Sequence, residues 1–254
     1  MSRADVLRAA AVAVTGAAAG SCGADRGGDG ARETGRQRVT ANPARLAARA
    51  ASAPEEAPDT GVRTRGRAPL DSARRRRGQP GALRASAPGA GGSARDALGL
   101  LLPLADEHAL VLAAPQSREH VGRDRGGYGP DVEAIDALLA EAFATVAVDA
   151  GRVAIGGFSD GVSYALSLGL ANGDLFRSIL AFSPGFSAEP KRRGSPRVFL
   201  SHGRADRVLP IETTSRRIVP RLRKEGYDVR YREFAGPHTV PGPVAREAVE
   251  WWLE

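Results

Sequence analysis

Short apolar runs and helical patterns alternate along the chain from about residue 91 onward. Strand candidates occupy residues 110–114, 152–156, 178–183, 198–201 and 229–234, and all but the last are predominantly apolar. Apolar residues recur at helical spacing over residues 132–146, 164–170, 218–222 and 244–253. Strands that alternate with helices through short connections predict an α/β fold, with a mostly parallel central sheet and helices on both faces.

The preceding part of the chain has a different composition. Residues 23–87 are rich in Arg, Ala, Gly and Pro, contain few large apolar side chains, and include four consecutive arginines at 74–77. Such a segment buries too little apolar surface to fold alone, so the N-terminal third is predicted to be largely disordered or irregular. The arginine run is interpreted as a solvated, disordered stretch, with binding to anionic lipid or nucleic acid as the alternative. The predicted divisions are therefore 1–22, 23–87 and a folded domain at 88–254.

The net charge of +7 is carried by the first 95 residues, where 17 Arg accompany 8 acidic residues. The remaining residues are slightly acidic in sum, so no nucleic-acid partner is expected for the folded domain. Cys22 is the only cysteine, which excludes an intramolecular disulfide and a cysteine zinc site. No pair of histidines has the spacing of a metal-binding helix, and no glycine-rich stretch carries the lysine of a phosphate loop. We therefore expect no metal and no cofactor.

The first 22 residues have the pattern of an export signal: a short basic start, an apolar stretch and a small-residue end at Cys22. Residues 2–8 are similar to a twin-arginine signal whose second arginine is replaced by Ala4, and residues 19–22 resemble a bacterial lipoprotein cleavage site. The expectation is an exported or membrane-anchored protein of a bacterial envelope, attached through Cys22. An uncleaved leader on a cytoplasmic protein is the alternative.

One pentapeptide carries the clearest chemical signal. Residues 157–161 read Gly-Phe-Ser-Asp-Gly, follow the strand at 152–156 and precede the helical pattern. A serine on a sharp strand-to-helix turn takes strained backbone angles, so its neighbours must lack bulky side chains. This context predicts a nucleophile elbow at Ser159. A glycine-rich chain can also produce the bare pattern by chance, so the prediction depends on partners elsewhere.

Two further loops supply such partners. Asp206 follows the strand at 198–201, and His238 follows the strand at 229–234. Functional groups of a parallel sheet gather at the carboxyl ends of its strands. A serine hydroxyl becomes a good nucleophile when an imidazole takes its proton, and the imidazole needs a carboxylate to hold its tautomer. We predict Ser159 as nucleophile, His238 as base and Asp206 as the residue that orients the base.

Each of these residues also has a simpler interpretation. Asp206 alone suits a turn, and His238 alone suits a loop. His202 is a rival base, but it lies at a strand end before the acid and is interpreted as packing beside the loop. Asp160 and Asp174 are rival acids; the first adjoins the nucleophile and the second follows its helix.

From residue 91 to the C-terminus the chain resembles the phospholipase/carboxylesterase family of small α/β hydrolases, which includes acyl-protein thioesterases. The resemblance rests on residues 156–161, 202–210 and 236–241. It implies the α/β-hydrolase fold and hydrolysis of a carboxylic ester or thioester, through an acyl-serine intermediate and without a cofactor. The implied partner is a small-molecule acyl ester; the acyl group and the oligomeric state stay open.

The pattern of the family is broken near residue 88. Relatives carry His-Gly after a strongly apolar strand, whereas this chain has Pro88 followed by Gly-Ala-Gly-Gly. The family pattern places the two oxyanion-hole donors at the backbone N–H groups of Ala90 and Asp160. Residues 81–87 do not predict a convincing central strand to hold this loop. Because losing one such donor costs about 100- to 1000-fold in turnover, the alternative function is an inactive or impaired hydrolase-like protein.

Two more departures concern the same comparison. Residues 61–87 have the bias of GC-rich coding sequence read out of frame, which suggests a local frameshift as a hypothesis that resequencing would test. Residues 117–128 lack the Trp-Asp pair of relatives, and His120 within them is interpreted as a loop residue.

Overall fold

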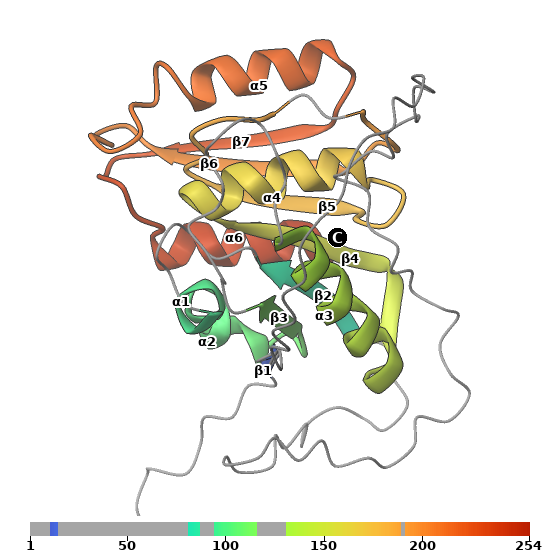
Figure 1. Ribbon diagram of the computed structural model, residues 1–254. Coiled ribbons are helices and arrows are strands. Elements are labelled where there is room, and N and C mark those ends of the chain that lie inside the picture. Colours follow the sequence, from blue (N-terminus) through green and yellow to red (C-terminus); the bar gives the residue numbers. More distant parts are fainter. Residues whose placement is uncertain (1–10, 15–80, 87–93, 116–130, 189–190) are drawn as a thin grey trace, which may run out of the picture.

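The computed structural model describes residues 11–14, 81–86, 94–115, 131–188 and 191–254 (Figure 1). Within them, seven parallel strands form one sheet in the order β1-β3-β2-β4-β5-β6-β7. The strands are β1 Ala11–Val14, β2 Gly81–Ser86, β3 Val111–Pro115, β4 Val148–Phe158, β5 Ser178–Phe182, β6 Arg197–Gly203 and β7 Val229–Phe234. The helices are α1 Ala94–Gly99, α2 Leu102–Ala105, α3 Asp131–Thr145, α4 Asp160–Ala171, α5 Ser215–Lys224 and α6 Gly242–Leu253.

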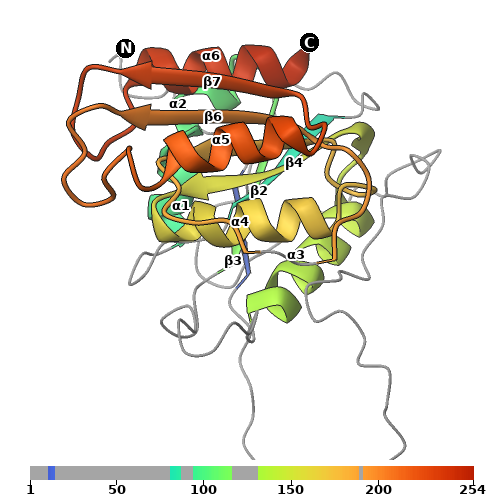
Figure 2. The same cartoon turned by 90° about the horizontal axis from the view of Figure 1, so that it is seen from above.

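Helices cover both faces of this sheet, as Figure 2 shows for α3, α4 and α5 on one side and α6 on the other. The alternation of side chains along β4 explains the two layers. Val153 and Ile155 belong to the apolar core under α3, α4 and α5. Ala154 belongs to the core under α1, α2 and α6. The prediction of an α/β-hydrolase fold with a parallel sheet between helical layers is confirmed.

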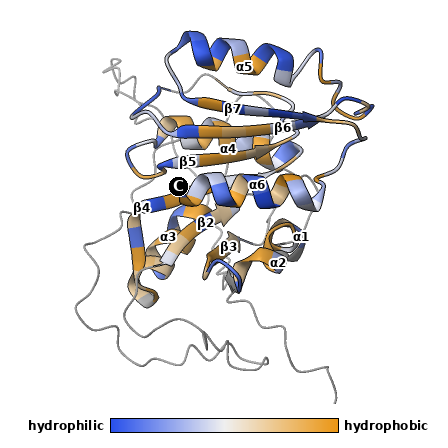
Figure 3. Cartoon of the chain, turned by 180° about the vertical axis from the view of Figure 1, so that it is seen from behind, coloured by the Kyte–Doolittle hydropathy of each residue, from blue (hydrophilic) through white to orange (hydrophobic). Residues whose placement is uncertain are grey.

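Most elements after residue 100 lie where the apolar pattern predicts them. The helix expected over 132–146 is α3, and the strand expected over 229–234 is β7. The pattern gives no prediction for α1 and α2, because helices of 6 and 4 residues are too short to show a helical period. Figure 3 shows the apolar residues concentrated on the strands, while α5 carries many hydrophilic residues.

The expectation that residues 81–87 lack a central strand is wrong. Gly81–Ser86 forms β2, which is buried at all six positions and lies between β3 and β4. Leu83 is in register with Val111 on one side and with Val153 on the other. The strand exists because β3 and β4 need a hydrogen-bonded partner between them, a requirement that the local sequence does not display. The sheet therefore begins before the domain boundary predicted at residue 88.

The predicted leader contributes four residues to the described structure. Ala11–Val14 forms β1 and pairs with β3 at the edge of the sheet. The rest of residues 1–22, and residues 23–80 before β2, lie outside the described residues. Their predicted export and disorder therefore stay predictions. Among the helices that are described, none is long and apolar enough to cross a membrane.

Candidate active site

Ser159 occupies the turn between β4 and α4. Its backbone angles, φ 60° and ψ −130°, lie in a region that non-glycine residues rarely adopt. Its N–H donates to the Phe182 carbonyl at 3.1 Å, which ties the turn to β5. A serine at a helix N-cap usually hydrogen-bonds the first turn, but the Ser159 side chain makes no such bond to α4. The hydroxyl is thus directed away from its own helix.

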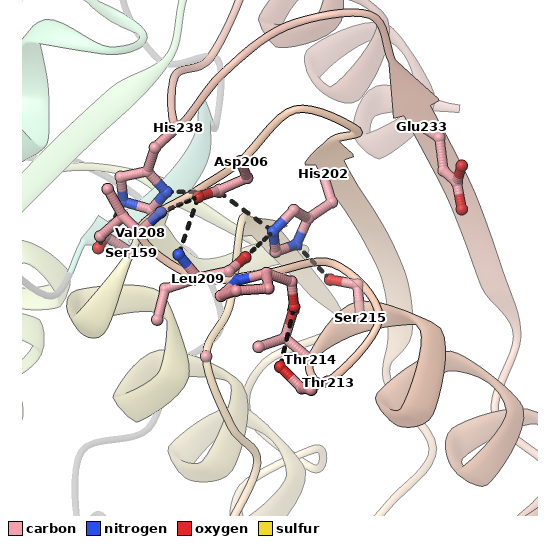
Figure 4. Close-up of polar contacts among 12 residues, drawn as sticks. Ser159, His202, Asp206, Val208, Leu209, Thr213, Thr214, Ser215, Glu233 and His238 are labelled. Carbon is pink, nitrogen blue, oxygen red and sulfur yellow. Dashed lines mark hydrogen bonds and ion pairs between the residues drawn. The ribbon is translucent and has the colours of Figure 1, made fainter.

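The hydroxyl of Ser159 is hydrogen-bonded to His238, and His238 is hydrogen-bonded to Asp206 (Figure 4). His238 Nε2 lies 2.9 Å from Ser159 Oγ, and His238 Nδ1 lies 2.6 Å from Asp206 Oδ2. Because an ionised carboxylate only accepts hydrogen bonds, Nδ1 carries the proton and Nε2 accepts from the serine hydroxyl. The structure brings the three residues predicted from the sequence together, each from a loop beyond the carboxyl end of its own strand.

The Asp206 carboxylate is buried and held by backbone donors. Its Oδ1 accepts hydrogen bonds from the N–H groups of Val208 at 2.9 Å and Leu209 at 2.8 Å. Burial raises the pKa of Asp206, but the hydrogen bonds from Leu209, His238 and Val208 together outweigh burial and hold that pKa below its ordinary value. Asp206 is therefore a carboxylate whenever His238 needs a negatively charged partner.

This depressed pKa predicts a specific loss of stability in acid. A carboxylate with a lowered pKa stabilises the fold fully above the unfolded value of about 3.9, and the contribution is lost as pH falls through the folded value. Below pH ~4, the free energy of unfolding should decrease more steeply in the wild type than in Asp206→Asn. Urea unfolding followed by circular dichroism at several pH values measures both slopes. Equal slopes would contradict this prediction.

His202 lies fully buried next to Asp206. Its Nδ1 is 2.6 Å from Ser215 Oγ, and its Nε2 is 2.8 Å from the Leu209 carbonyl oxygen and 3.2 Å from Asp206 Oδ2. Burial lowers the pKa of His202, so the ring is neutral at pH 7. Both ring nitrogens face these neighbours, so the sequence interpretation of His202 as a residue beside the loop captures its place but misses its hydrogen bonds.

The rival acids and the oxyanion donors have different positions. Asp160 is the first residue of α4, directly after Ser159, and Asp174 follows the end of that helix. Neither takes the place of Asp206, whose carboxylate contacts the base. Ala90 and His120 lie outside the described residues, so the first oxyanion donor is not placed.

One cavity is lined by His238 and a second by its neighbour Phe158. A cavity of about 310 Å³ is lined by Asp96, Ala97, Gly99, Leu100, Phe158 and Val240. Phe158 also contacts His238, with ring centroids 4.6 Å apart. The second cavity, of about 460 Å³, is lined by Ala205, Arg207, Val208, Pro237 and His238. The lining from α1 could not be found by sequence reasoning, because only the fold brings this short helix beside the elbow.

Among the residues that the structure describes, no group of three or more His, Cys, Asp or Glu side chains could hold a metal ion. Ser159, His238 and Asp206 form a hydrogen-bonded chain from a hydroxyl through an imidazole to a carboxylate. Such a chain can move the hydroxyl proton to the imidazole and hold the positive imidazolium next to the negative carboxylate.

One family model and several solved structures match parts of this chain. The model of the phospholipase/carboxylesterase family matches residues 126–241, which include Ser159, Asp206 and His238. This match covers less than half of the chain. The resemblance inferred from the sequence motifs is confirmed within the matched residues, and the phospholipase/carboxylesterase segment runs from before α3 to the loop that carries the base. No curated protein sequence matches the chain significantly.

Solved structures extend the likeness beyond the phospholipase/carboxylesterase segment. The esterase PE8 is 25% identical, with a TM-score of 0.58 over 68% of this chain and 92% of its own. A phospholipase/carboxylesterase from Dyadobacter fermentans is 22% identical, with a TM-score of 0.52 over 69% of this chain and 90% of its own. A single-residue variant of SOBER1 from Arabidopsis thaliana is 14% identical, with a TM-score of 0.55 over 68% of this chain and 97% of its own. The last two show a shared fold.

Proposed function

We propose that this protein is a serine hydrolase that cleaves carboxylic esters or thioesters through an acyl-serine intermediate. The observation that supports it best is the line from Ser159 Oγ through His238 to Asp206, at 2.9 and 2.6 Å, on a strained turn within an esterase-family segment. The names of the similar proteins, an esterase and a phospholipase/carboxylesterase, are consistent with this chemistry. The substrate class is a small-molecule acyl ester.

In this mechanism Ser159 Oγ attacks the acyl carbon while its proton moves to His238 Nε2. His238 then carries a positive charge, which the Asp206 carboxylate stabilises through Nδ1. The tetrahedral intermediate collapses when the imidazolium donates its proton to the leaving oxygen or sulfur. A water molecule, deprotonated by His238, hydrolyses the acyl-serine and restores the starting state.

The developing oxyanion needs two hydrogen-bond donors. We propose the backbone N–H groups of Ala90 and Asp160, as in the family pattern. Asp160 directly follows Ser159 and begins α4, so the positive end of the helix dipole also favours negative charge there. The two cavities beside Phe158 and His238 would receive the acyl and leaving groups of the substrate.

A fluorophosphonate probe tests the proposed function, because it reacts with an activated serine and requires no knowledge of the natural substrate. We expect the full-length protein to be labelled, with the added mass on the peptide that contains Ser159. Hydrolysis of a short-chain p-nitrophenyl ester should be lost in parallel with labelling. A sample with a cooperative unfolding transition that is neither labelled nor hydrolytic would overturn the proposal.

Replacing the carboxylate tests the role of Asp206. Asp206→Asn keeps the size of the side chain but favours the wrong tautomer of His238, so kcat should fall by about 10⁴-fold. Steady-state ester hydrolysis measures this fall, with Asp174→Asn as the matched control that retains wild-type kcat. If the two variants were equally active, Asp206 would not be the orienting residue.

A second candidate is an impaired hydrolase-like protein, and one observation favours it. The strand before the oxyanion loop carries Arg84, which is fully buried and whose three guanidinium nitrogens have no hydrogen-bond partner among the described residues. A strand that contains a buried charge without a partner would position the Ala90 N–H donor less firmly. The same probe separates the candidates, because an impaired protein would fold without reacting.

A further inference from the structure

We propose that His202 is a positioning residue that holds the Asp206 carboxylate in line with His238. The inference rests on the proposed function and deepens it. His202 touches neither Ser159 nor His238 by any hydrogen bond among the described residues, so it would act only through its neighbours. Figure 4 shows its ring between Asp206 and the start of α5.

The tautomer of His202 follows from its partners. A carbonyl oxygen can only accept, so the 2.8 Å contact between Nε2 and the Leu209 carbonyl requires a proton on Nε2. The ring is buried and neutral, so Nδ1 carries no proton and accepts the hydroxyl hydrogen of Ser215 at 2.6 Å. Nε2 therefore donates to the loop that carries Asp206, and Nδ1 fixes the ring to α5.

Leu209 links His202 to the carboxylate. Its carbonyl accepts from His202 Nε2, and its N–H donates to Asp206 Oδ1 at 2.8 Å. The His202 N–H also faces the other oxygen, Oδ2, at 3.2 Å, which is the oxygen that binds His238 Nδ1 at 2.6 Å. His202 thus restrains the loop that binds Oδ1 and places a partial positive charge beside Oδ2.

Ser215 anchors this arrangement in the core. It is fully buried at the first position of α5, a helix that packs against β6 and β7. His202 itself lies within β6, so both ends of the contact belong to rigid elements. A carboxylate held by a flexible loop alone would let His238 turn, and a displacement of about 1 Å at a reacting group can cost 10²-fold in rate.

Two substitutions at His202 separate positioning from simple packing. In His202→Phe the ring volume is kept and both hydrogen bonds are lost, so kcat for ester hydrolysis should fall about 100-fold while KM stays within about 3-fold. In His202→Gln an amide N–H takes the approximate place of Nε2–H, so kcat should recover to within about 10-fold of the wild type. His108→Phe, at a histidine next to α2, is the matched control and should leave both constants unchanged.

A second variant covers the case in which His202→Phe does not fold. Ser215→Ala keeps the ring and removes only the bond that orients it, so kcat should fall about 10-fold with KM unchanged. Wild-type kcat in a folded His202→Phe or, failing that, in Ser215→Ala would overturn the inference, while an active wild type would leave the proposed function intact.

If the wild type were itself inactive, the proposed function would fail and proton NMR would decide the inference. The downfield resonance of the His238 Nδ1 proton, which reports the contact with Asp206, should shift or broaden in His202→Phe and be restored in His202→Gln. An unchanged resonance would overturn the positioning role.

Discussion

Ser159→Ala is expected to abolish fluorophosphonate labelling and to lower kcat for ester hydrolysis by about 10⁶-fold. The hydroxyl is the group that would bond to the acyl carbon, and its oxygen lies 2.9 Å from His238 Nε2, the proposed base. The fall should be as large as that caused by removing the base, because the members of such a line act as one unit. Labelling with mass spectrometry and steady-state hydrolysis measure the two effects.

The substitution also predicts little cost to the fold. Ser159 makes no capping bond through its side chain, so alanine removes no hydrogen bond from α4. The unfolding transition in urea should stay close to that of the wild type. Thr213→Ala, at an exposed hydroxyl that follows the loop of Asp206, serves as the control with unchanged activity. Persistent labelling of Ser159→Ala would place the reactive residue elsewhere.

Arg84→Met is expected to raise the free energy of unfolding by about 3 kcal/mol, because a buried charge without a partner is costly. Arg84 is 0% exposed in the central strand β2. Burial lowers its pKa to about 9, which still leaves the guanidinium charged at pH 7. Methionine keeps an unbranched chain of similar length and adapts to irregular spaces, so it should fill the site without the charge.

The surroundings of Arg84 explain why the side chain fits at all. It lies on the face of β2 shared with Ala82, toward the core under α1, α2 and α6. A Cβ atom at Gly156 would lie 3.0 Å from Arg84 Nε and 2.4 Å from the Leu180 carbonyl oxygen. The guanidinium therefore lies against Gly156 of β4. Any larger residue at position 156 would collide with the backbone of Leu180.

Urea unfolding of the wild type, Arg84→Met and a surface control measures this gain. Arg230→Met, on the half-exposed edge strand β7, should change stability by less than about 1 kcal/mol. Arg84→Lys keeps the charge and should give no gain. If Arg84→Met were less stable than the wild type, Arg84 would have a partner that compensates its charge.

Resequencing of the codons for residues 61–87 independently tests the frameshift hypothesis.

The grouping of Ser159, Asp206 and His238 was predictable because each of the three has a local signature. The elbow needs small residues around Ser159, and the two other loops each follow a predicted strand. Parallel strands bring their carboxyl ends to one edge, so chain order and strand ends sufficed to group Ser159, Asp206 and His238. The distances of 2.6 and 2.9 Å could not be predicted.

Strand β2 shows where local reasoning fails. An arginine and a serine in a six-residue run argue against a central strand, yet β3 and β4 leave a place that only a strand can fill. His202 is a second case: the sequence places it at a strand end but cannot show that Ser215, thirteen residues later, lies within 2.6 Å.

The sequence by itself determined the α/β alternation, the positions of α3, α4 and β7, and the three residues of the proposed catalytic line. These features depend on periodicity, glycine placement and chain order, which are local properties. Only the tertiary structure decided that Gly81–Ser86 is a central strand, that Arg84 is buried without a partner in the described residues, and that His202 contacts the acid. These depend on which segments become neighbours, because hydrogen bonding and burial are set by contacts between residues far apart in the chain.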